Sequence, residues 1–210
     1  MSRESKSRDW MRQHVNDPYV KQAQAQGYRS RAAFKLIELA QKDGLIAPGF
    51  TVVDLGATPG SWSQVLAKAV GPSGKVVAVD ILDMEPLKGV QFIQGDFRED
   101  GVLADIEKAL VGRPVDLVVS DMSPNLSGVA SADQARSIYL CELALDFACK
   151  HLTKNGNFLV KVFQGAGFPE FHVAMRAAFT KVNARKPQAS RDRSVEFYLV
   201  GKHLKQAAKP

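Results

Sequence analysis

The chain has 210 residues, 45% of them hydrophobic, which is enough to bury the core of one α/β domain of ordinary size. No run of 18 apolar residues is present and the start of the chain is polar and charged, so we expect neither a membrane-spanning helix nor a secretory signal. The net charge of +6 is uneven: residues 1–50 carry nine Lys/Arg against five Asp/Glu, residues 51–175 carry 10 against 15, and residues 176–210 carry nine against two. Basic ends favour a polyanionic partner such as nucleic acid, although termini that only keep the chain soluble would give the same pattern.

Helices and strands are predicted to alternate along most of the chain. Apolar residues at helical spacing predict helices over residues of about 30–42, 61–70, 101–111, 133–152 and 169–179. Short apolar runs predict strands at Thr51–Gly56, Lys75–Asp80, Val90–Asp96, Val115–Asp121, Asn157–Phe163 and Val195–Gly201. This alternation is typical of an α/β fold with a parallel sheet covered on both faces. The last run follows residues 181–187 without a helix between, so the sheet is expected to close with an antiparallel pair.

Two helix starts carry local signals. Ser131 and Gln134 have the spacing of a capping box at the start of the long helix. Pro169 suits the first turn of the helix that follows the fifth strand, because a proline there loses no helical hydrogen bond.

The whole chain, 1–210, is expected to form a single domain. Residues 1–9 are predicted to be a disordered basic extension and residues 203–210 a flexible basic tail. Cys141 and Cys149 lie eight residues apart in a helical pattern and are expected to be free thiols, which indicates a cytoplasmic protein.

Four predicted strands end in or near an acid: Asp54, Asp80, Asp96 and Asp121. An isolated acid at a strand end is usually a turn residue, but the carboxyl ends of parallel strands meet at the ligand-binding edge of an open α/β sheet. There, the carboxylate of Asp80 can accept from both hydroxyls of a ribose, and that of Asp96 from an exocyclic amine. An acidic site of this kind suits a nucleoside with a positively charged tail, such as S-adenosylmethionine.

The loop after the first strand is rich in small residues, with Gly56 and Gly60 spaced as G-x-x-x-G. This spacing is neither the dinucleotide fingerprint nor the phosphate-binding P-loop. A ligand can still approach the backbone closely here, and a tight turn with no ligand is the alternative interpretation.

Two charged residues lie inside apolar strands. Lys161 shares one strand face with Leu159 and Phe163, and Glu196 is surrounded by apolar residues in the last strand. Burying a charge is costly unless it is paired, so these residues and Asp121 indicate one polar site, although a snorkelling lysine or a structural ion pair would also account for Lys161. Lys35 lies on the polar side of its helix and is expected to face solvent.

Several motifs in order resemble the FtsJ/RrmJ family of large-subunit ribosomal RNA 2′-O-ribose methyltransferases: RSRAAFKLIEL, VVDLGATPGSWSQ, QGDF, SDMSPN, LVKVFQG and SVEFYLV. The resemblance covers residues of about 10–202 and implies a class I, Rossmann-like methyltransferase fold with a seven-stranded, mostly parallel sheet. It implies S-adenosylmethionine as the cofactor, with contacts at Gly60, Trp62, Asp80, Asp96 and Asp121. It also implies a catalytic tetrad of Lys35, Asp121, Lys161 and Glu196.

The resemblance further implies a substrate, a uridine ribose in the A-loop of 23S rRNA within the large ribosomal subunit. A monomer is expected, with no metal and no membrane partner. RNA phosphates are expected to meet basic residues near both ends of the chain, which are Arg29, Arg31, Arg185, Lys186 and Arg191, with Arg3, Lys6, Arg8, Arg12 and Arg193 beside them. Three residues depart from the family pattern, Ser61 in place of glycine and Thr58 and Ser123 in place of alanine, and altered hydrogen bonding is expected at each.

A ribose hydroxyl is a poor nucleophile and has to lose its proton, so Lys161 is predicted to act as the base or to orient the hydroxyl. Burial, Lys35 and the cofactor's positive sulfur favour a neutral amine, whereas Asp121 and Glu196 favour the ammonium, so both roles stay open. Three other classes of protein are alternatives: a small-molecule methyltransferase, an RNA-binding assembly factor with a vestigial pocket, and a nicotinamide dehydrogenase, which the glycine spacing disfavours.

Overall fold

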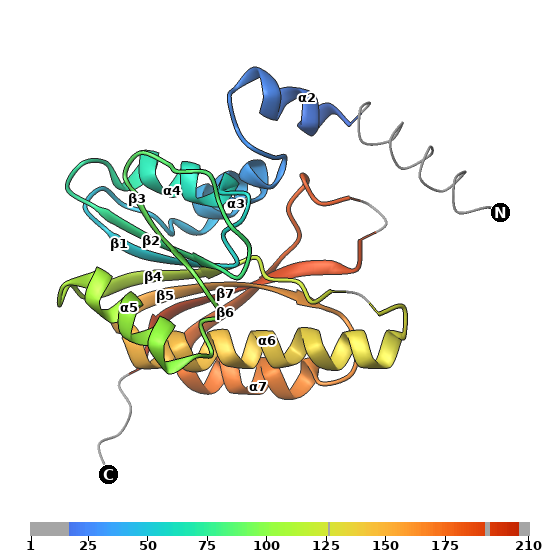
Figure 1. Cartoon of the computed structure of the whole chain (residues 1–210). Coiled ribbons are helices and arrows are strands. Elements are labelled where there is room, and N and C mark those ends of the chain that lie inside the picture. Colours follow the sequence, from blue (N-terminus) through green and yellow to red (C-terminus); the bar gives the residue numbers. More distant parts are fainter. Residues whose placement is uncertain (1–16, 126, 192–193, 206–210) are drawn as a thin grey trace, which may run out of the picture.

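A computed structural model describes residues 17–125, 127–191 and 194–205 (Figure 1). The elements in chain order are α2 (Pro18–Ala25), α3 (Ala32–Asp43), β1 (Thr51–Leu55), α4 (Ser61–Val70), β2 (Lys75–Asp80), β3 (Val90–Gln94), α5 (Asp100–Leu110), β4 (Val115–Ser120), α6 (Ala130–His151), β5 (Leu152–Phe163), α7 (Phe168–Ala178), β6 (Phe179–Arg185) and β7 (Glu196–Leu204). The predicted extension at residues 1–9 lies outside the described residues.

Seven strands form one sheet in the order β3-β2-β1-β4-β5-β7-β6. The neighbours from β3 to β5 pair in parallel, and β7 pairs antiparallel with both β5 and β6. This is the seven-stranded, mostly parallel sheet that the family resemblance implies. β2 and β3 lie on one side of β1, and β4, the next strand in the chain, lies on the other side. The switch in strand order is therefore between β1 and β4. In open α/β sheets a ligand binds at the carboxyl ends of the strands that flank this switch.

The sheet separates two apolar cores (Figure 1). On one face, Val53 and Leu55 of β1 pack with residues of α5, α6 and α7. On the other face, Val52 packs with residues of α3 and α4. Side chains alternate between the faces of a strand, so β1 needs apolar residues on both sides and reads as a continuous apolar run.

Most predicted elements are confirmed, with differences at their ends. α2 was not predicted, although its start carries a standard signal: Asp17 accepts a hydrogen bond from the Tyr19 N–H at 3.0 Å, and Pro18 follows it. β6 was expected only as the partner of an antiparallel pair. β7 continues to Leu204, so the first two residues of the segment predicted as a tail, 203–210, belong to a strand.

The predicted capping box of the long helix is wrong. α6 begins earlier, after Val129, which makes no side-chain cap. The Asp133 carboxylate accepts hydrogen bonds from the N–H and hydroxyl of Ser127, each at 2.7 Å, while Gln134 donates to the carbonyl of Phe163 at 3.3 Å. The local spacing was suitable, but Gln134 is used to hold the end of β5. The prediction for Pro169, at the start of α7, is confirmed.

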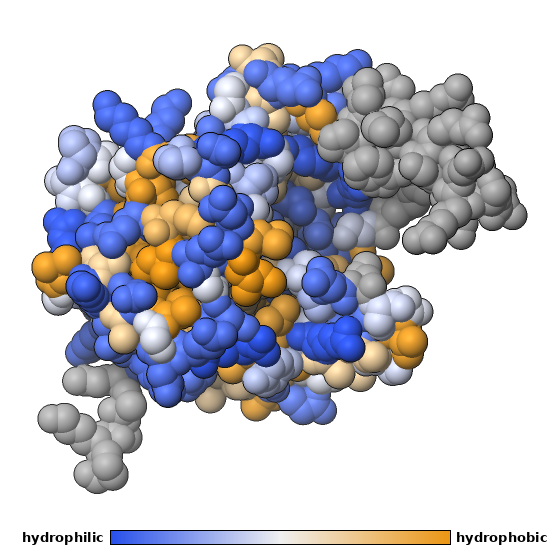
Figure 2. Space-filling model, viewed as in Figure 1, coloured by the Kyte–Doolittle hydropathy of each residue, from blue (hydrophilic) through white to orange (hydrophobic). Residues whose placement is uncertain are grey.

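Both cysteines are free, as predicted, with Cys141 buried and Cys149 exposed. Within the described ranges, no helix is long and apolar enough to cross a bilayer. Figure 2 shows apolar residues gathered near the middle of one face, with polar residues around them.

Candidate active site

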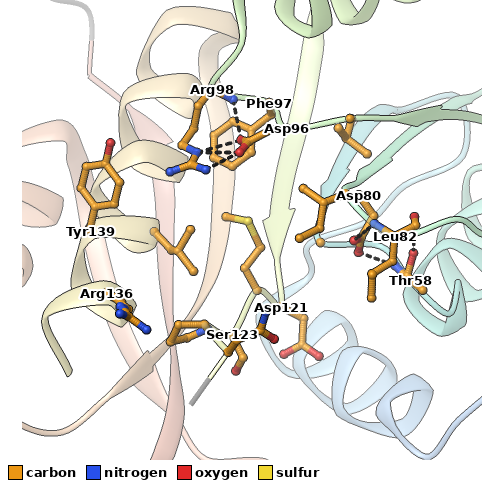
Figure 3. A pocket seen from close by; sticks show the side chains of 18 residues that line it. Thr58, Asp80, Leu82, Asp96, Phe97, Arg98, Asp121, Ser123, Arg136 and Tyr139 are labelled. Carbon is orange, nitrogen blue, oxygen red and sulfur yellow. Dashed lines mark hydrogen bonds and ion pairs between the residues drawn. The ribbon is translucent and has the colours of Figure 1, made fainter. Parts of the chain in front are cut away.

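A cavity of about 450 Å³ opens at the carboxyl ends of β1, β2, β3 and β4. This volume is within the range of small-molecule sites, about 300–1,000 Å³. Its labelled lining residues are Thr58, Asp80, Leu82, Asp96, Phe97, Arg98, Asp121, Ser123, Arg136 and Tyr139 (Figure 3). The structure therefore brings together three of the four acids that the sequence placed at strand ends.

Asp80, the last residue of β2, is held by backbone groups from two loops. One carboxylate oxygen accepts from the Thr58 N–H and the other from the Leu82 N–H, each at 2.9 Å. These bonds fix the carboxylate at the wall of the cavity (Figure 3). Each oxygen can accept a second hydrogen bond, so Asp80 can still receive ligand hydroxyls.

Asp96 follows β3 and is paired with Arg98. The Arg98 Nε lies 2.8 Å from both carboxylate oxygens of Asp96, and a second guanidinium nitrogen also contacts this carboxylate. The hydrogen bonds from Arg98 hold the pKa of Asp96 below its usual range. Arg98 and Tyr139 lie along one side of the cavity, across from Asp80 (Figure 3).

Lys161 and Asp121 meet where the ends of β4 and β5 come together. The Lys161 Nζ donates to the Asp121 backbone carbonyl at 2.5 Å and lies 3.2 Å from the Asp121 carboxylate oxygen Oδ1. Tyr198 of β7 donates its hydroxyl to the same Oδ1 at 2.8 Å. The Lys161 side chain is only 7% exposed, so it is neither snorkelling nor solvated.

Lys35 and Glu196 form a second pair beside the first. The Lys35 Nζ makes an ion pair and hydrogen bond with the Glu196 carboxylate, and it lies 5.9 Å from the centroid of the Tyr198 ring. Burial would raise the pKa of Glu196, but the charge and hydrogen bond of Lys35, with the charge of Lys161, outweigh burial and lower it. Tyr198 therefore lies between two lysine–acid pairs, and its own pKa is raised, first by burial and then by Asp121 and Glu196.

The prediction that Lys35 faces solvent is wrong, because its side chain is only 12% exposed. The polar side of α3 is covered by the connection between β6 and β7. Along this side, Arg31 donates to the carbonyl of Ala189, and the Glu38 carboxylate accepts from the Gln188 N–H at 2.7 Å. Helical periodicity located the polar face correctly, but it does not show that a distant segment packs on it.

The glycine loop after β1 leads into α4. Gly60 is the residue before α4 and has a φ of +99°, which favours glycine. Trp62, in the first turn of α4, is 3% exposed, donates its indole N–H to the Ala32 carbonyl at 2.8 Å, and packs with its ring centroid 5.8 Å from that of Tyr198. Gly60 and Trp62, predicted as cofactor contacts, are not among the residues that line the cavity. They lie at the junction of the glycine loop with α4, and Trp62 packs toward Tyr198 and the two lysine–acid pairs.

Two of the three residues that depart from the family pattern use their extra hydroxyl. The Ser61 Oγ lies 2.7 Å from the Ser30 Oγ, and the Thr58 hydroxyl donates to the Leu82 carbonyl at 3.2 Å. Both bonds join the glycine loop to a neighbouring segment. Ser123 lines the cavity (Figure 3).

Asp54, at the end of β1, is fully buried on the face of the sheet that packs against α4. One carboxylate oxygen accepts from the Ser63 hydroxyl at 2.7 Å, and among the described residues the other oxygen, Oδ1, has no hydrogen-bond partner. The pKa of Asp54 is raised to about 7, because burial and the negative charges of Asp121 and Asp80 raise it by more than the Ser63 hydrogen bond lowers it.

Arg31 is engaged within the protein. Its guanidinium pairs with the Asp17 carboxylate, donates to the Ala189 carbonyl, and lies 5.6 Å from the centroid of the Tyr19 ring. Burial and the nearby positive charge of Arg191 lower the pKa of Arg31. Arg31 is therefore largely committed to contacts within the protein.

Two other cations predicted to bind RNA also contact groups of the protein. Arg185 binds the Asp43 carboxylate through two nitrogens, each at 2.8 Å, and Lys186 donates to the Ser194 carbonyl at 2.6 Å. The predicted basic residues that lie outside the described residues are Arg3, Lys6, Arg8, Arg12 and Arg193.

Two residues of the site were not singled out from the sequence. Tyr198 lies two residues after Glu196, so the two-residue period of a strand places both on one face. Arg98 lies two residues after Asp96, but its ion pair with Asp96 depends on the turn that brings the two side chains together. Among the described residues, no group of three or more His, Cys, Asp or Glu could hold a metal ion.

The sequence model of the FtsJ-like methyltransferase family matches residues 28–204, which span α3, all seven strands and the whole site described above. The chain belongs to this family. The family resemblance and the methyltransferase class predicted from the sequence are therefore confirmed.

Two relatives are similar over nearly their whole length. The chain is 60% identical over 205 residues to the ribosomal RNA large subunit methyltransferase E of Azoarcus sp. (strain BH72), covering 98% of this chain and 100% of that protein. It is 61% identical over 201 residues to the protein of the same name from Neisseria meningitidis serogroup C (strain 053442), covering 96% and 98%.

Solved structures share the fold. A crystal structure described as a ribosomal RNA methyltransferase from Plasmodium falciparum superposes with a TM-score of 0.74 at 29% identity, covering 84% of this chain and 98% of that one. A structure described as an rRNA-methylase from Clostridium thermocellum has a TM-score of 0.52 at 19% identity, covering 81% and 96%, and shows likeness of fold alone.

Proposed function

We propose that this enzyme transfers a methyl group from S-adenosylmethionine to the 2′-oxygen of a uridine ribose in the A-loop of 23S rRNA, in the assembled large ribosomal subunit. The observation that carries the proposal is the pairing of Lys161 with Asp121 and of Lys35 with Glu196 next to the strand-end cavity. The names of the relatives support ribosomal RNA of the large subunit as the substrate.

The residues of the cavity fit S-adenosylmethionine. Asp80, Asp96 and Asp121 lie at or near the ends of β2, β3 and β4 and line the cavity, so their carboxylates face the space that a ligand would fill. A positively charged ligand would relieve the repulsion between these acids. The Asp80 carboxylate would accept from the ribose hydroxyls and Asp96 from the adenine amine, with Gly60 and Trp62 shaping the loop beside the methionine tail.

When bound, S-adenosylmethionine supplies an electrophilic methyl group on a positively charged sulfur. Lys161 would orient the substrate oxygen, because two of its three N–H groups are directed to Asp121 and the third is left for the ribose hydroxyl. The hydroxyl proton is lost as the new bond to oxygen forms, and the Asp121 carboxylate, next to Lys161, would accept it. Lys35, Glu196 and Tyr198 would hold this arrangement in a site largely closed to water.

A basic surface beside the site would bind RNA phosphates. The proposed residues are Arg31, Arg185, Lys186 and Arg191. Arg29 was predicted with them, but its guanidinium is held by the carbonyls of Pro59 and Pro86. Arg191 gives the strongest support, because it is exposed and its positive charge contributes to lowering the pKa of Arg31, so an anion bound there would be favoured. Charge reversal at Arg191 should weaken RNA binding and reduce the salt slope by about 1, as expected for one lost phosphate contact.

The reaction can be tested with labelled S-adenosylmethionine, supplied with undermethylated large subunits, with free rRNA or with a panel of small molecules. We expect label on one A-loop uridine of the subunit and its loss in Lys161→Ala with cofactor binding retained. Lys154→Ala, an exposed lysine of the same strand, is the matched control and should remain active. Label only on small molecules, or none despite cofactor binding, would contradict the proposal.

A further inference from the structure

We propose that Arg29 is a positioning residue for the methyl donor, which fastens the glycine loop from outside, and not an RNA phosphate contact. This inference rests on the proposed donor, S-adenosylmethionine. The Arg29 guanidinium donates through Nη1 to the Pro59 carbonyl at 2.8 Å and through Nη2 to the Pro86 carbonyl at 3.1 Å. Pro59 belongs to the loop after β1, and Pro86 to the segment after β2, so one side chain joins the two loops that flank Asp80.

The guanidinium lies directly against the glycine of the loop. A Cβ added to Gly60 would lie 2.8 Å from the Arg29 Nη1, 2.8 Å from the Leu87 Cδ1 and 2.9 Å from the Met84 Sδ. Real Cβ atoms essentially never approach a neighbour this closely. The absence of a side chain at Gly60 therefore makes room for Arg29 and the segment after β2, in addition to permitting the positive φ.

The backbone around Arg29 is joined to α4 as well. The Arg29 N–H donates to the Gln64 side-chain oxygen at 2.8 Å, and the Gln64 amide donates back to the Gly27 carbonyl at 2.9 Å. Next along the chain, Ser30 contacts Ser61 through their hydroxyls at 2.7 Å. Every contact in this set joins the segment before α3 to the glycine loop or to the first turn of α4.

These contacts couple the donor site to the catalytic pairs. The segment 27–32 leads directly into α3, which carries Lys35, and the loop it holds leads from β1 to Trp62. A rigid link between the segment 27–32 and the glycine loop would keep the position of this loop fixed relative to Lys35. Both terminal nitrogens of Arg29 are directed to carbonyls that flank the donor site, so a phosphate bound by Arg29 would release both loops.

The test compares two substitutions of Arg29 with a matched control. Arg113 is an exposed arginine that donates to the Ser73 carbonyl at 3.0 Å, away from the cavity. For Arg29→Ala, Arg29→Lys and Arg113→Ala, we would measure the Kd for S-adenosylmethionine by calorimetry, the Kd for 23S rRNA at several salt concentrations, and the thermal midpoint. A KM for each substrate completes the set.

Arg29→Ala is expected to weaken S-adenosylmethionine binding about tenfold, or ~1.4 kcal/mol, with KM for the donor raised and the RNA salt slope unchanged. Arg29→Lys should be intermediate, since an ammonium reaches one carbonyl but does not span two. Arg113→Ala should leave the donor Kd unchanged even if its midpoint falls.

Three results would overturn the inference: an unchanged donor Kd in Arg29→Ala, a flattened RNA salt slope in that variant, or an equal loss of donor affinity in Arg113→Ala. If the unsubstituted protein binds no S-adenosylmethionine, the proposed function fails instead, and the two failures are distinguished by that first titration.

Discussion

Asp54→Asn should make the protein more stable at pH 8, although it changes a buried residue at the end of β1. The pKa of Asp54 rises from 3.8 to about 7, so the folded protein holds a proton there that the unfolded chain releases near pH 4. Three units at ~1.36 kcal/mol each give about 4 kcal/mol. Between pH 4 and 7 the folded state binds more protons than the unfolded state, so this residue lowers stability as pH rises, and the loss levels off above pH 7.

Asparagine is close in shape to the protonated acid and does not titrate. The difference in unfolding free energy between Asp54→Asn and the unsubstituted protein should therefore grow by about 4 kcal/mol from pH 4 to pH 8, in favour of the variant. Urea unfolding at several pH values without ligand measures this difference. Ser63→Ala should move the transition to higher pH, because the Ser63 hydroxyl favours the carboxylate. Parallel stability curves for the two proteins across this range would refute the reasoning.

Three further predictions concern other buried groups. Tyr198→Phe should lower kcat by about tenfold with little change in donor Kd, because it removes a hydrogen bond of ~1.5 kcal/mol to Asp121; an unchanged kcat in a single-turnover assay would exclude this role. Glu196→Gln should destabilise the protein at neutral pH. The loss in unfolding free energy should shrink as pH falls through the lowered pKa of Glu196, because the ion pair with Lys35 is then lost in the unsubstituted protein as well. A loss that is constant with pH in urea titrations would contradict a stabilising ion pair. Burial raises the pKa of Cys141 to about 12, so iodoacetamide at pH 8 should label one thiol per native chain, and rapid labelling of both, read by mass spectrometry, would show that this burial is wrong.

Local patterns were sufficient for the sheet and for part of the site. Continuous apolar strands separated by helices can be buried only with helices on both faces, and parallel strands end at one edge, so the acids that follow them meet there. The two-residue period placed Lys161 on an apolar face, where only a paired charge is tolerated. These inferences needed no knowledge of how distant segments pack.

The tertiary structure decided which polar groups find each other. Lys35 is buried because the β6–β7 connection, about 150 residues away, packs on the polar side of α3, and helical periodicity carries no signal for that contact. The same holds for Arg29, whose charge suggested RNA and whose position joins two loops. Charge and spacing are local properties of a sequence, whereas burial and pairing depend on what the fold brings to the other side of each residue.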